Sequence, residues 1–579
     1  MTLKKHFGAE NVTDLSNKFN DHYATLTTKL KSSYKRKQVP VCKNEKKKHS
    51  RPKLKNSIFI PQISKTEVIN ILMAMDRNKA PGIDRIQLKH LQDSAQNTSI
   101  VIAKIINKTI DEEIWPTKLK IQVLRPIYKG GKAKDLTNYR LIPILRILDK
   151  ILQKYISSVI YKFLYKHEVL DKSQYGFQEN KGTSDALVFV KDTVSEALHQ
   201  GKVVGAVLID FQKAFDTLNH TVLCDKLQNY GFRGKSLNLI KSYLSDRQMC
   251  TKIDTTYSNY CTVKEGVPQG SNLGPLLFLL YVNDIASEIS YSQIVLFADD
   301  ILLISIHYDE KTLNDFDTLV KWTLCNELFI SEMKTKSMFI TSPNKRRKEA
   351  HLGIKIHSDD CFFKINTCNS ENSRCVILEE VADYKYLGMV LDKNMKWNKH
   401  VESLIQKIRG TLPKLYQLKN ILSSQNKRIV YFAWIESYLR YGLEIYGGTS
   451  QSMINRLQRI QNKVIKVLFQ TSQRESKHVL YKKLQILPIK ALFDYVILLK
   501  YYFANEYKIN KDNSKNLRYV SETFQVPEWR NNFGRCISRY IVPKTFNKLP
   551  TNLKKLQTFG IVKKALKEWL FSNLDKYLE

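Results

Sequence analysis

The sequence predicts an α/β fold followed by a helical C-terminal part, and three patterns indicate it. Val203–Ile209 is an almost continuous apolar run rich in β-branched residues, which is typical of a buried strand. Ile294–Ile304 is a second such run, interrupted only by Asp299 and Asp300. Two apolar arms around a pair of acids predict a hairpin with carboxylates at its turn. Beyond Trp397 the apolar residues recur at helical spacing instead.

The remaining elements follow from the same periodicities. Residues 60–220 alternate helical patterns with short apolar strands. Two C-terminal stretches each keep one apolar face, which we interpret as core packing. Basic side chains fill the rest of the second stretch, and their contact with nucleic acid is a separate hypothesis. The first face comprises Val401, Leu404, Ile405 and Ile408; the second comprises Met453, Leu457, Ile460, Val464 and Leu468, with Arg456, Arg459, Lys463 and Lys466 beside it.

The charge balance favours a polyanionic partner. The 579 residues include 93 Lys and Arg against 55 Asp and Glu, a formal net charge of +38. Basic side chains that neutralise phosphates release counterions, so such an excess favours nucleic-acid binding over a role in solubility alone. The 43% of hydrophobic residues excludes a chain that is disordered throughout, and the length predicts two to four domains.

The N-terminal region is predicted to be an exposed basic linker, residues 1–59. Residues 31–55 hold eleven Lys or Arg and one acid, Glu45, and they lack apolar periodicity. Such a run suits phosphate backbones or nuclear import, and a solvated charge run without a partner is an equal alternative. A second basic run, Lys345–Lys348, is predicted to lie at a loop tip.

Nine cysteines are scattered without a disulfide or zinc pattern, which favours thiols in a reducing compartment. Met1–Glu10 has no apolar core of a secretory signal, and Pro275–Val282 is too short to span a bilayer. We therefore expect an intracellular protein of the nucleus or cytoplasm, with no membrane partner. One cluster has a spacing that matches none of the usual zinc pairings, so a zinc site is disfavoured: His351, His357, Cys361, Cys368 and Cys375.

Acids at the ends of apolar strands are the chemical anomaly of the sequence. Asp210 follows one predicted strand, Asp299 and Asp300 interrupt the other, and no Lys or Arg lies within either strand. An ionised carboxylate costs several kcal/mol to desolvate unless it is paired or binds a metal. A few carboxylates with water and substrate phosphates suit Mg²⁺. The alternative is that the acids merely cap strands at a solvent edge.

A glycine- and proline-rich loop, Gly266–Pro275, lies between the two strands. Three glycines and two prolines in ten residues predict a tight loop that a ligand backbone can approach closely. A helix is expected after it, from Leu276, packed beneath the sheet.

Together these segments resemble the reverse transcriptases of non-LTR retrotransposons, the LINE and jockey-like elements. The resemblance covers residues 78–392 closely and extends more weakly to the C-terminus. Nine segments occur in family order: Asn78–Asp84, Pro126–Gly130, Asn138–Arg140, Gln174–Phe177, Asp210–Asp216 with Asn219 and His220, Gly266–Pro275, Phe297–Asp300, Leu328–Thr335 and Tyr386–Gly388.

The resemblance implies a right-hand polymerase, an α/β (α+β) fold. Fingers and palm with an antiparallel palm sheet would span residues 60–395. A helical thumb would span residues 396–475. A C-terminal helical region of unknown role would span residues 476–579. The partners implied are an RNA template, a DNA primer or target, and deoxynucleoside triphosphates.

The resemblance also implies an RNA-directed DNA polymerase that uses two Mg²⁺ ions, with Mn²⁺ as a substitute. Asp210, Asp299 and the backbone carbonyl of Phe211 would hold the metal ions. Asp300 would shape the site more than ligate, and Lys334 is the candidate acid that protonates pyrophosphate, although a surface lysine is almost as plausible there.

The same resemblance assigns the nucleotide contacts. Arg140 and Lys129 are candidates to clamp the triphosphate. Phe215 would act as a steric gate against the ribose 2′-hydroxyl, with an ordinary core aromatic as the alternative. Gln269 would line the sugar pocket, and Gly270 would let the backbone approach the template.

Three residues depart from the family pattern: Leu141 where proline is usual, Gln178 where arginine is common, and Ser331 where asparagine is usual. They put local loop and template geometry in doubt. The residues before the polymerase region are too few for the endonuclease domain of full elements, so we expect a polymerase without it. Two alternatives stay open: a catalytically inactive RNA- or DNA-binding remnant, and a polymerase that copies DNA templates.

Overall fold

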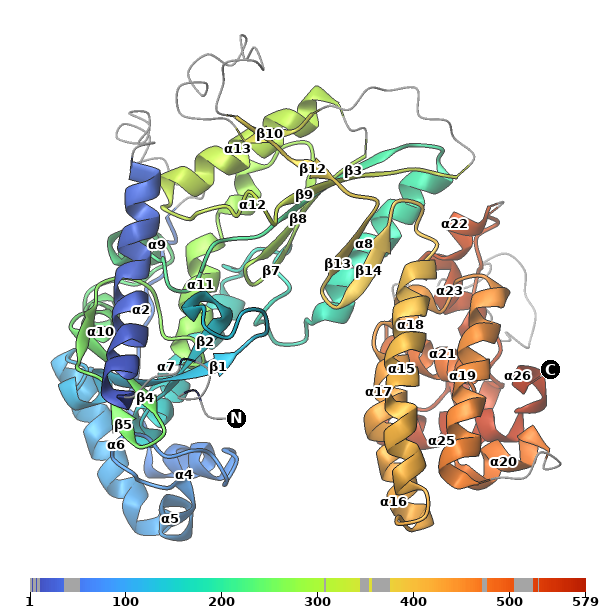
Figure 1. The fold of residues 1–579 in the computed structure, drawn as a ribbon, viewed down its shortest axis with the longest axis horizontal. Coiled ribbons are helices and arrows are strands. Elements are labelled where there is room, and N and C mark those ends of the chain that lie inside the picture. Colours follow the sequence, from blue (N-terminus) through green and yellow to red (C-terminus); the bar gives the residue numbers. More distant parts are fainter. Residues whose placement is uncertain are drawn as a thin grey trace.

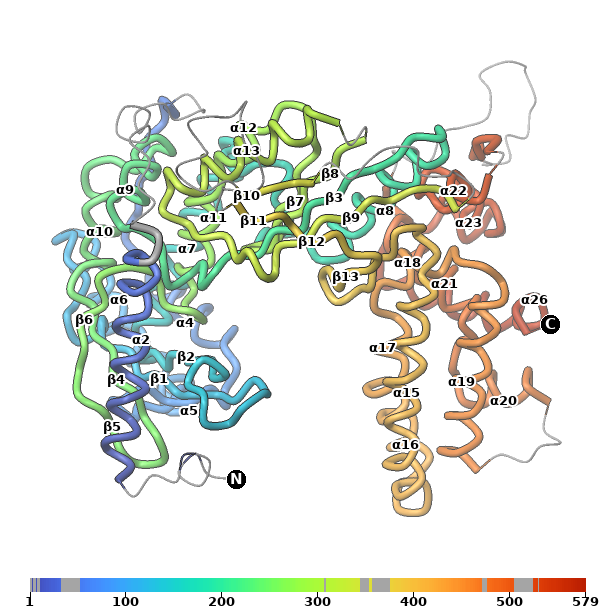
Figure 2. The backbone as a smooth tube through the Cα atoms, turned by 45° about the horizontal axis from the view of Figure 1, so that its top comes forward, coloured from blue at the N-terminus to red at the C-terminus, as the bar shows by residue number. Residues whose placement is uncertain are grey.

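The computed structural model describes residues 3, 7, 11–35, 53–306, 309–343, 353–356, 375–470, 476–504, 524–529 and 531–578. Figure 1 shows an N-terminal α/β part and a C-terminal helical part, with a sheet lying between them. Figure 2 shows the same arrangement after a turn of 45°. None of the helices in the described stretches is both long and apolar enough to cross a membrane.

The central sheet confirms the two predicted strand regions. β3 pairs antiparallel with β8 and with β9, and β7 and β8 form the predicted hairpin. Every residue of β3 is buried, because its alternating side chains enter two different cores. Val207 and Ile209 face one core, and Ala206 and Leu208 face the other. The strand order is β12 (Glu379–Glu380), β9 (Lys336–Ile340), β3 (Val204–Ile209), β8 (Asp300–Ser305) and β7 (Gln293–Phe297).

A second sheet lies in the N-terminal part. β1 (Ile121–Tyr128) pairs antiparallel with β2 (Tyr139–Ile144) and parallel with β4 (Arg247–Ile253), which also pairs with β5 (Thr256–Tyr257) and β6 (Cys261–Val263). Helices supply most of the surrounding core. They are α4 (Lys65–Met73), α5 (Leu88–Asp93), α6 (Ala95–Glu112), α7 (Ile147–Lys166), α9 (His220–Asn229), α10 (Lys235–Leu244), α11 (Leu273–Val282), α12 (Ile285–Glu288) and α13 (Glu310–Cys325).

The N-terminal region is not a linker throughout, which corrects the expectation for residues 1–59. Val12–Lys35 is a helix, α2, and its Leu15 and Phe19 are buried against the second sheet. Ile58 is also buried, in the large N-terminal core. The linker expectation came from the basic run of residues 31–55, whereas most of α2 precedes that run and packs through Leu15 and Phe19 on strands that lie far along the chain. Residues 36–52 and the basic run Lys345–Lys348 lie outside the described residues.

The C-terminal part is helical, as its periodicity predicts. Val401, Leu404, Ile405 and Ile408 are buried on α15. On α19 the predicted apolar face is buried except Met453, which is only partly buried. The helices are α15 (Asn398–Leu418), α16 (Ser424–Tyr431), a π-helical turn (Phe432–Glu436), α17 (Ser437–Arg440), α18 (Leu443–Tyr446), α19 (Gln451–Phe469), α20 (Lys477–Leu484), α21 (Ile489–Tyr501), α22 (Asn532–Arg535), α23 (Ser538–Phe546), α24 (Thr551–Lys554), α25 (Phe559–Ser572) and α26 (Asp575–Leu578).

α8 (Thr183–His199) and a short hairpin, β13 (Asp383–Tyr386) with β14 (Met389–Asp392), connect the central sheet to these helices. β10 (Lys355–Ile356) and β11 (Val376–Ile377) form a separate pair. The described cysteines form no disulfide. Of the disfavoured zinc cluster only Cys375 is described; His351, His357, Cys361 and Cys368 lie outside the described residues.

Candidate active site

Three carboxylates lie at one end of the central sheet. Asp210 follows the last residue of β3, and Asp299 lies in the turn between β7 and β8. Asp300 is the first residue of β8 and pairs with Phe297 across that turn. Because β3 and β8 are antiparallel neighbours with Ile209 opposite Ile301, the strand end that carries Asp210 meets the turn that carries the other two acids.

The charges of neighbouring acids contribute to a raised pKa at Asp299 and Asp300. Burial, and then the charge of Asp210, raises the pKa of Asp299. Burial, and then the charges of Asp299 and Asp210, raises the pKa of Asp300 to about 6, although the residue as a whole keeps access to solvent. Lys334 pairs with one of them: its Nζ lies 3.1 Å from Oδ1 of Asp210. Carboxylates that repel one another in this way favour a bound cation.

A loop before α8 holds the hairpin turn in place. The backbone N–H of Tyr175 donates to the carbonyl of Leu296 at 2.8 Å. A Cβ atom on Gly176 would lie 2.4 Å from the backbone nitrogen of Ala298, so only glycine fits there. Ala298 has a φ of +56°, a left-handed conformation in the residue next to Asp299. The segment Gln174–Phe177, one of the nine that resemble the family, therefore positions Asp299 and Asp300.

The glycine-rich loop packs on the segment after β3. The N–H of Val267 donates to the carbonyl of Phe215 at 2.8 Å. Gly266 has a φ of +78°, and a Cβ there would lie 2.6 Å from the carbonyl oxygen of Asp216. α11 begins at Leu273, three residues before the predicted start. A helix tolerates proline in its first turn, so Leu273 and Gly274 belong to the same turn as Pro275.

Ring contacts define the position of Phe215 and hydrogen bonds define that of Gln269, while Gly270 borders open space. The Phe215 ring stacks on Phe278 of α11, with centroids 4.6 Å apart, and meets Phe177 edge to face at 6.3 Å. Nε2 of Gln269 donates to both carboxylate oxygens of Asp216, each at 3.0 Å. Gly270 has a φ of +83°, and a Cβ on it would meet no atom within 4 Å.

Four cations lie close enough to one another to interact. Burial, followed by the charge of Lys213, lowers the pKa of Lys129, and Arg140 and Lys334 act in the same direction. Burial also lowers the pKa of Lys213, although the carboxylate of Asp216 opposes this. Cations that repel one another, and that Asp216 and Asp210 only partly compensate, form a positive region suited to a polyanion.

Sequence reasoning missed Lys213 and Asp216 as site residues. Both belong to the segment Asp210–Asp216, so the signal was present, but their roles depend on partners far along the chain. Lys213 has a φ of +53°, and its Nζ lies 5.2 Å from the ring centroid of Tyr23. Burial raises the pKa of Asp216, while Lys213, followed by Gln269, opposes the rise.

The predicted residues share this region of the molecule. Phe211 is buried and forms an isolated antiparallel bridge with Ile330, which places the Leu328–Thr335 segment beside Asp210. Arg140 and Lys129 are exposed on the β1–β2 hairpin region, and a hydrogen bond from Lys129 N to Asn138 O, 2.8 Å long, closes that hairpin.

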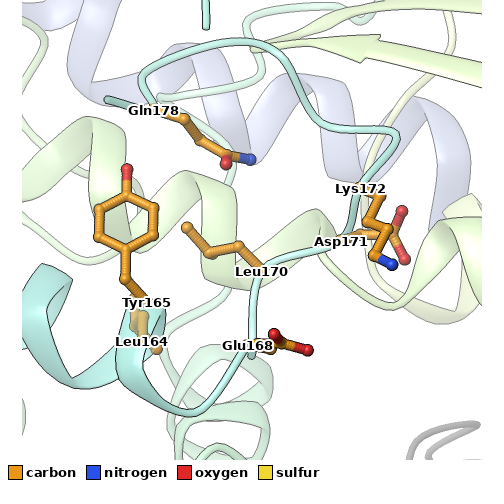
Figure 3. A pocket seen from close by; sticks show the side chains of 7 residues that line it. All are labelled: Leu164, Tyr165, Glu168, Leu170, Asp171, Lys172 and Gln178. Atoms are coloured by element: carbon orange, nitrogen blue, oxygen red, sulfur yellow. The ribbon is translucent and has the colours of Figure 1, made fainter. Parts of the chain in front are cut away.

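A separate pocket, with a volume of about 470 Å³, lies between the end of α7 and the segment that leads from it to Gln178. Figure 3 shows its lining: Leu164, Tyr165, Glu168, Leu170, Asp171, Lys172 and Gln178. Gln178 is one of the three departures from the family pattern, and its Nε2 donates to the carbonyl of Gln174 at 2.8 Å. No member of the carboxylate cluster lines this pocket.

The donor set suits Mg²⁺ bound together with a substrate. In the described stretches, no three or more His, Cys, Asp or Glu side chains form a ready metal cage. Mg²⁺ is commonly held by one or two carboxylates, with substrate phosphates and water completing the octahedron. Asp210 and Asp299 fit that pattern, since each lies beside the other and both act on the pKa of Asp300.

Comparisons with known proteins agree with this geometry. Residues 127–391 match the family described as reverse transcriptase (RNA-dependent DNA polymerase). Three Drosophila melanogaster relatives are similar over most of the chain. A probable RNA-directed DNA polymerase from transposon BS is 25% identical over 434 residues, 72% of this chain and 45% of the relative. The corresponding protein from transposon X-element is 26% identical over 415 residues, 69% and 43% of the two chains.

The third relative is the RNA-directed DNA polymerase from mobile element jockey, 23% identical over 419 residues, which cover 71% of this chain and 44% of the relative. The chain thus spans less than half the length of these relatives.

Proposed function

We propose that this chain is an RNA-directed DNA polymerase that extends a DNA primer on an RNA template, because residues 127–391 match the family described as reverse transcriptase (RNA-dependent DNA polymerase). The observation that carries the proposal is the cluster of Asp210, Asp299 and Asp300 at one end of the central sheet, beside four interacting cations. The relatives with the matching names belong to non-LTR retrotransposons, which supports the same origin for this chain.

We propose that Asp210 and Asp299, with the carbonyl of Phe211, hold two Mg²⁺ ions. Bound Mg²⁺ would lower the pKa of the primer 3′-hydroxyl and neutralise the departing pyrophosphate. Asp300 keeps the negative potential of the site high, and its pKa of about 6 would fall once a cation is bound. Mn²⁺ would occupy the same oxygen ligands.

The cations are proposed to bind the triphosphate. Arg140 offers a planar pair of donors to the phosphate oxygens, and Lys129 acts as a compact point charge. Lys334, which pairs with Asp210 at 3.1 Å, is proposed to protonate the pyrophosphate. Phe215, which stacks on Phe278, is the proposed steric gate. Gln269 and Gly270 are proposed to border the sugar and the template, and the hydrogen bond from Gln269 to Asp216 supports a fixed position for that loop.

The layout suits the right-hand arrangement. Residues 60–395 would form fingers and palm, residues 396–475 the thumb, and residues 476–579 a C-terminal helical region. α2 would extend the fingers, since Phe19 packs on Tyr139 of β2 with ring centroids 5.2 Å apart. The basic residues of α19 stay proposed contacts for the nucleic acid.

A primer-extension assay tests the function. Full-length protein with a DNA primer, an RNA template, deoxynucleoside triphosphates and Mg²⁺ should extend the primer, and Asp299→Ala should abolish extension. Glu112→Ala, at an exposed acid of α6, is the matched control and should keep full activity. Extension that survives Asp299→Ala would overturn the assigned site.

The second candidate function is a catalytically inactive remnant that binds RNA or DNA. It predicts salt-sensitive RNA binding by the wild-type chain, with no incorporation on any template. The third alternative, a polymerase that copies DNA, predicts more incorporation on a DNA template than on the RNA template of the same sequence. The intact acids and cations favour the active enzyme.

A further inference from the structure

α2 lies outside the segment that matches the family, residues 127–391, yet one of its faces contacts the candidate active site. Phe19, Tyr23, Thr27 and Lys31 recur at every fourth position, so they share one side of the helix. The first of them is buried against Tyr139 of β2. The next three contact residues near the carboxylates and the cations.

Tyr23 joins two of the nucleotide-site elements. Its hydroxyl donates to the carbonyl of Tyr139, the residue before Arg140, at 2.6 Å. Its ring lies 5.2 Å from Nζ of Lys213. An ammonium ion within about 6 Å of a ring centroid is attracted by the negative face of the ring. Tyr23 therefore holds the strand of Arg140 and the side chain of Lys213 at once.

Thr27 and Lys31 continue these contacts toward the glycine-rich loop. Oγ1 of Thr27 donates to the carbonyl of Asp216 at 3.3 Å. Nζ of Lys31 pairs with Glu265, next to Gly266, and lies 2.7 Å from Oε2 of Glu327. Contacts on both sides of Tyr23, from Phe19 before it and from Thr27 and Lys31 after it, therefore fix the position of Tyr23.

We propose that Tyr23 is a positioning residue for the incoming nucleotide: it orients Lys213 toward the triphosphate and fixes the β2 segment that carries Arg140. This inference rests on the proposed function, because it names a further element of the same site. Lys213 has a left-handed backbone (φ +53°) and interacts with Asp216 of its own segment, and the tyrosine ring of α2 supplies a second contact to its side chain.

Single-nucleotide incorporation by the full chain tests the proposal. Tyr23→Met, which keeps apolar bulk but removes the ring and hydroxyl, should raise the KM for the nucleotide by about three- to thirtyfold with a smaller change in kcat. Tyr23→Phe keeps the ring beside Lys213 but removes the hydrogen bond to Tyr139, so it should raise the KM less than Tyr23→Met does. Phe19→Leu, on the same helix face, is the control for loss of helix packing. Tyr23→Leu replaces Tyr23→Met should the latter not fold.

A double-mutant cycle separates positioning from packing. If Tyr23 acts through Lys213, the Tyr23→Met effect should be much smaller in a Lys213→Ala background. Inhibition by inorganic pyrophosphate should weaken in the same variants. Additive effects in the cycle, or a KM change no larger than that of Phe19→Leu, would overturn the inference.

A binding measurement keeps this test separate from that of the proposed function. Inorganic tripolyphosphate should raise the Tm of wild type and of Tyr23→Phe, but raise that of Tyr23→Met and Lys213→Ala less. Equal shifts in all four proteins would overturn the role of Tyr23. A wild-type chain that incorporates no nucleotide but shows the expected Tm pattern would overturn the proposed polymerase activity and leave the positioning role intact.

Discussion

At the scale of single residues, Phe215 lies where ring contacts restrict it on two sides. It stacks on Phe278, which is fully buried, and meets the edge of Phe177, which is 47% exposed. A ring held between a rigid partner and a surface partner stays in one orientation. This arrangement supports the proposed role of Phe215 as a steric gate.

Phe215→Val should reduce the preference for deoxynucleotides, because the smaller side chain leaves room for a ribose 2′-hydroxyl. We expect the ratio of kcat/KM for deoxynucleotide to ribonucleotide to fall by about tenfold or more, which corresponds to about 1.4 kcal/mol. Incorporation of both nucleotides on one primer–template measures it. Phe59→Val, at an exposed ring away from Phe215, is the control, and an unchanged ratio in Phe215→Val would assign Phe215 to the core alone.

His400 on α15 is buried, and burial, followed by the charge of Lys407, lowers its pKa to about 4. A depressed folded-state pKa means that the unfolded chain binds a proton first as the pH falls below about 6.5. Stability attributable to His400 should therefore be complete above pH 6.5 and decrease by up to about 3 kcal/mol toward pH 4.

His400→Phe, which keeps a ring beside Tyr446, should remove that part of the pH dependence. Thermal unfolding of wild type and variant at pH 7 and pH 5 measures the difference. The Tm of wild type should fall more than that of the variant. Equal falls in both proteins would show that protonation of His400 does not contribute to the loss of stability at low pH.

At the scale of elements, the β13–β14 hairpin depends on a residue from the helical part. Leu387 and Gly388 have φ values of +43° and +82°, so the turn places a leucine in the left-handed region. The hydroxyl of Tyr441 donates to the carbonyl of Leu387. A Cβ on Gly442 would lie 2.6 Å from Sδ of Met389, so the turn between α17 and α18 approaches the hairpin closely.

Tyr441→Phe should loosen the hairpin turn, because it removes one hydrogen bond that holds a strained residue. We expect a loss of about 1 kcal/mol of local stability. Amide hydrogen exchange at Tyr386 and Met389, which face each other across the turn, measures it. Tyr438→Phe, at an exposed position of the same helix, should leave the exchange unchanged; equal protection in both variants would contradict the role of the hydroxyl.

At the scale of the whole molecule, the central sheet separates two cores. One core fills the N-terminal part, and the other continues from the opposite face of the sheet into the C-terminal helices. Lys500 of α21 connects these helices to α8: its Nζ lies 2.9 Å from Oδ1 of Asp185 and 3.7 Å from Oε1 of Glu444, and it also bonds to Ser184. Figure 1 shows α8 between the sheet and the helices.

Lys500→Met should weaken this connection, because it leaves Asp185 and the buried Glu444 without their shared cation. We expect a loss of about 2 kcal/mol, less than for a fully buried pair because the lysine is partly exposed. Thermal unfolding measures it, with Lys490→Met at an exposed site of the same helix as the control. A Tm equal to that of the control would show that apolar packing alone holds the parts together.

Much of the candidate site was predictable because its strongest signal is local. A carboxylate at the end of an apolar strand is visible in the chain itself, so Asp210, Asp299 and Asp300 could be identified, as could the hairpin between β7 and β8. Lys213 and Asp216 could not be assigned roles, because these depend on Tyr23 and Gln269, which lie far away in the sequence.

The apolar pattern along the chain determined the strands, the hairpin and the later helices, since an apolar residue must be buried whichever partner covers it. The three acids were evident because they end or interrupt such apolar runs. The tertiary structure alone decided where those pieces meet: the register that brings Asp210 to the turn of Asp299, and the packing of α2 on the nucleotide site. Helix α2 shows the reason most clearly. Its contact face continues from the apolar Leu15 and Phe19 into Tyr23, Thr27 and Lys31, and the polar contacts of these three are specified by the partners opposite them, which no single segment of sequence reveals.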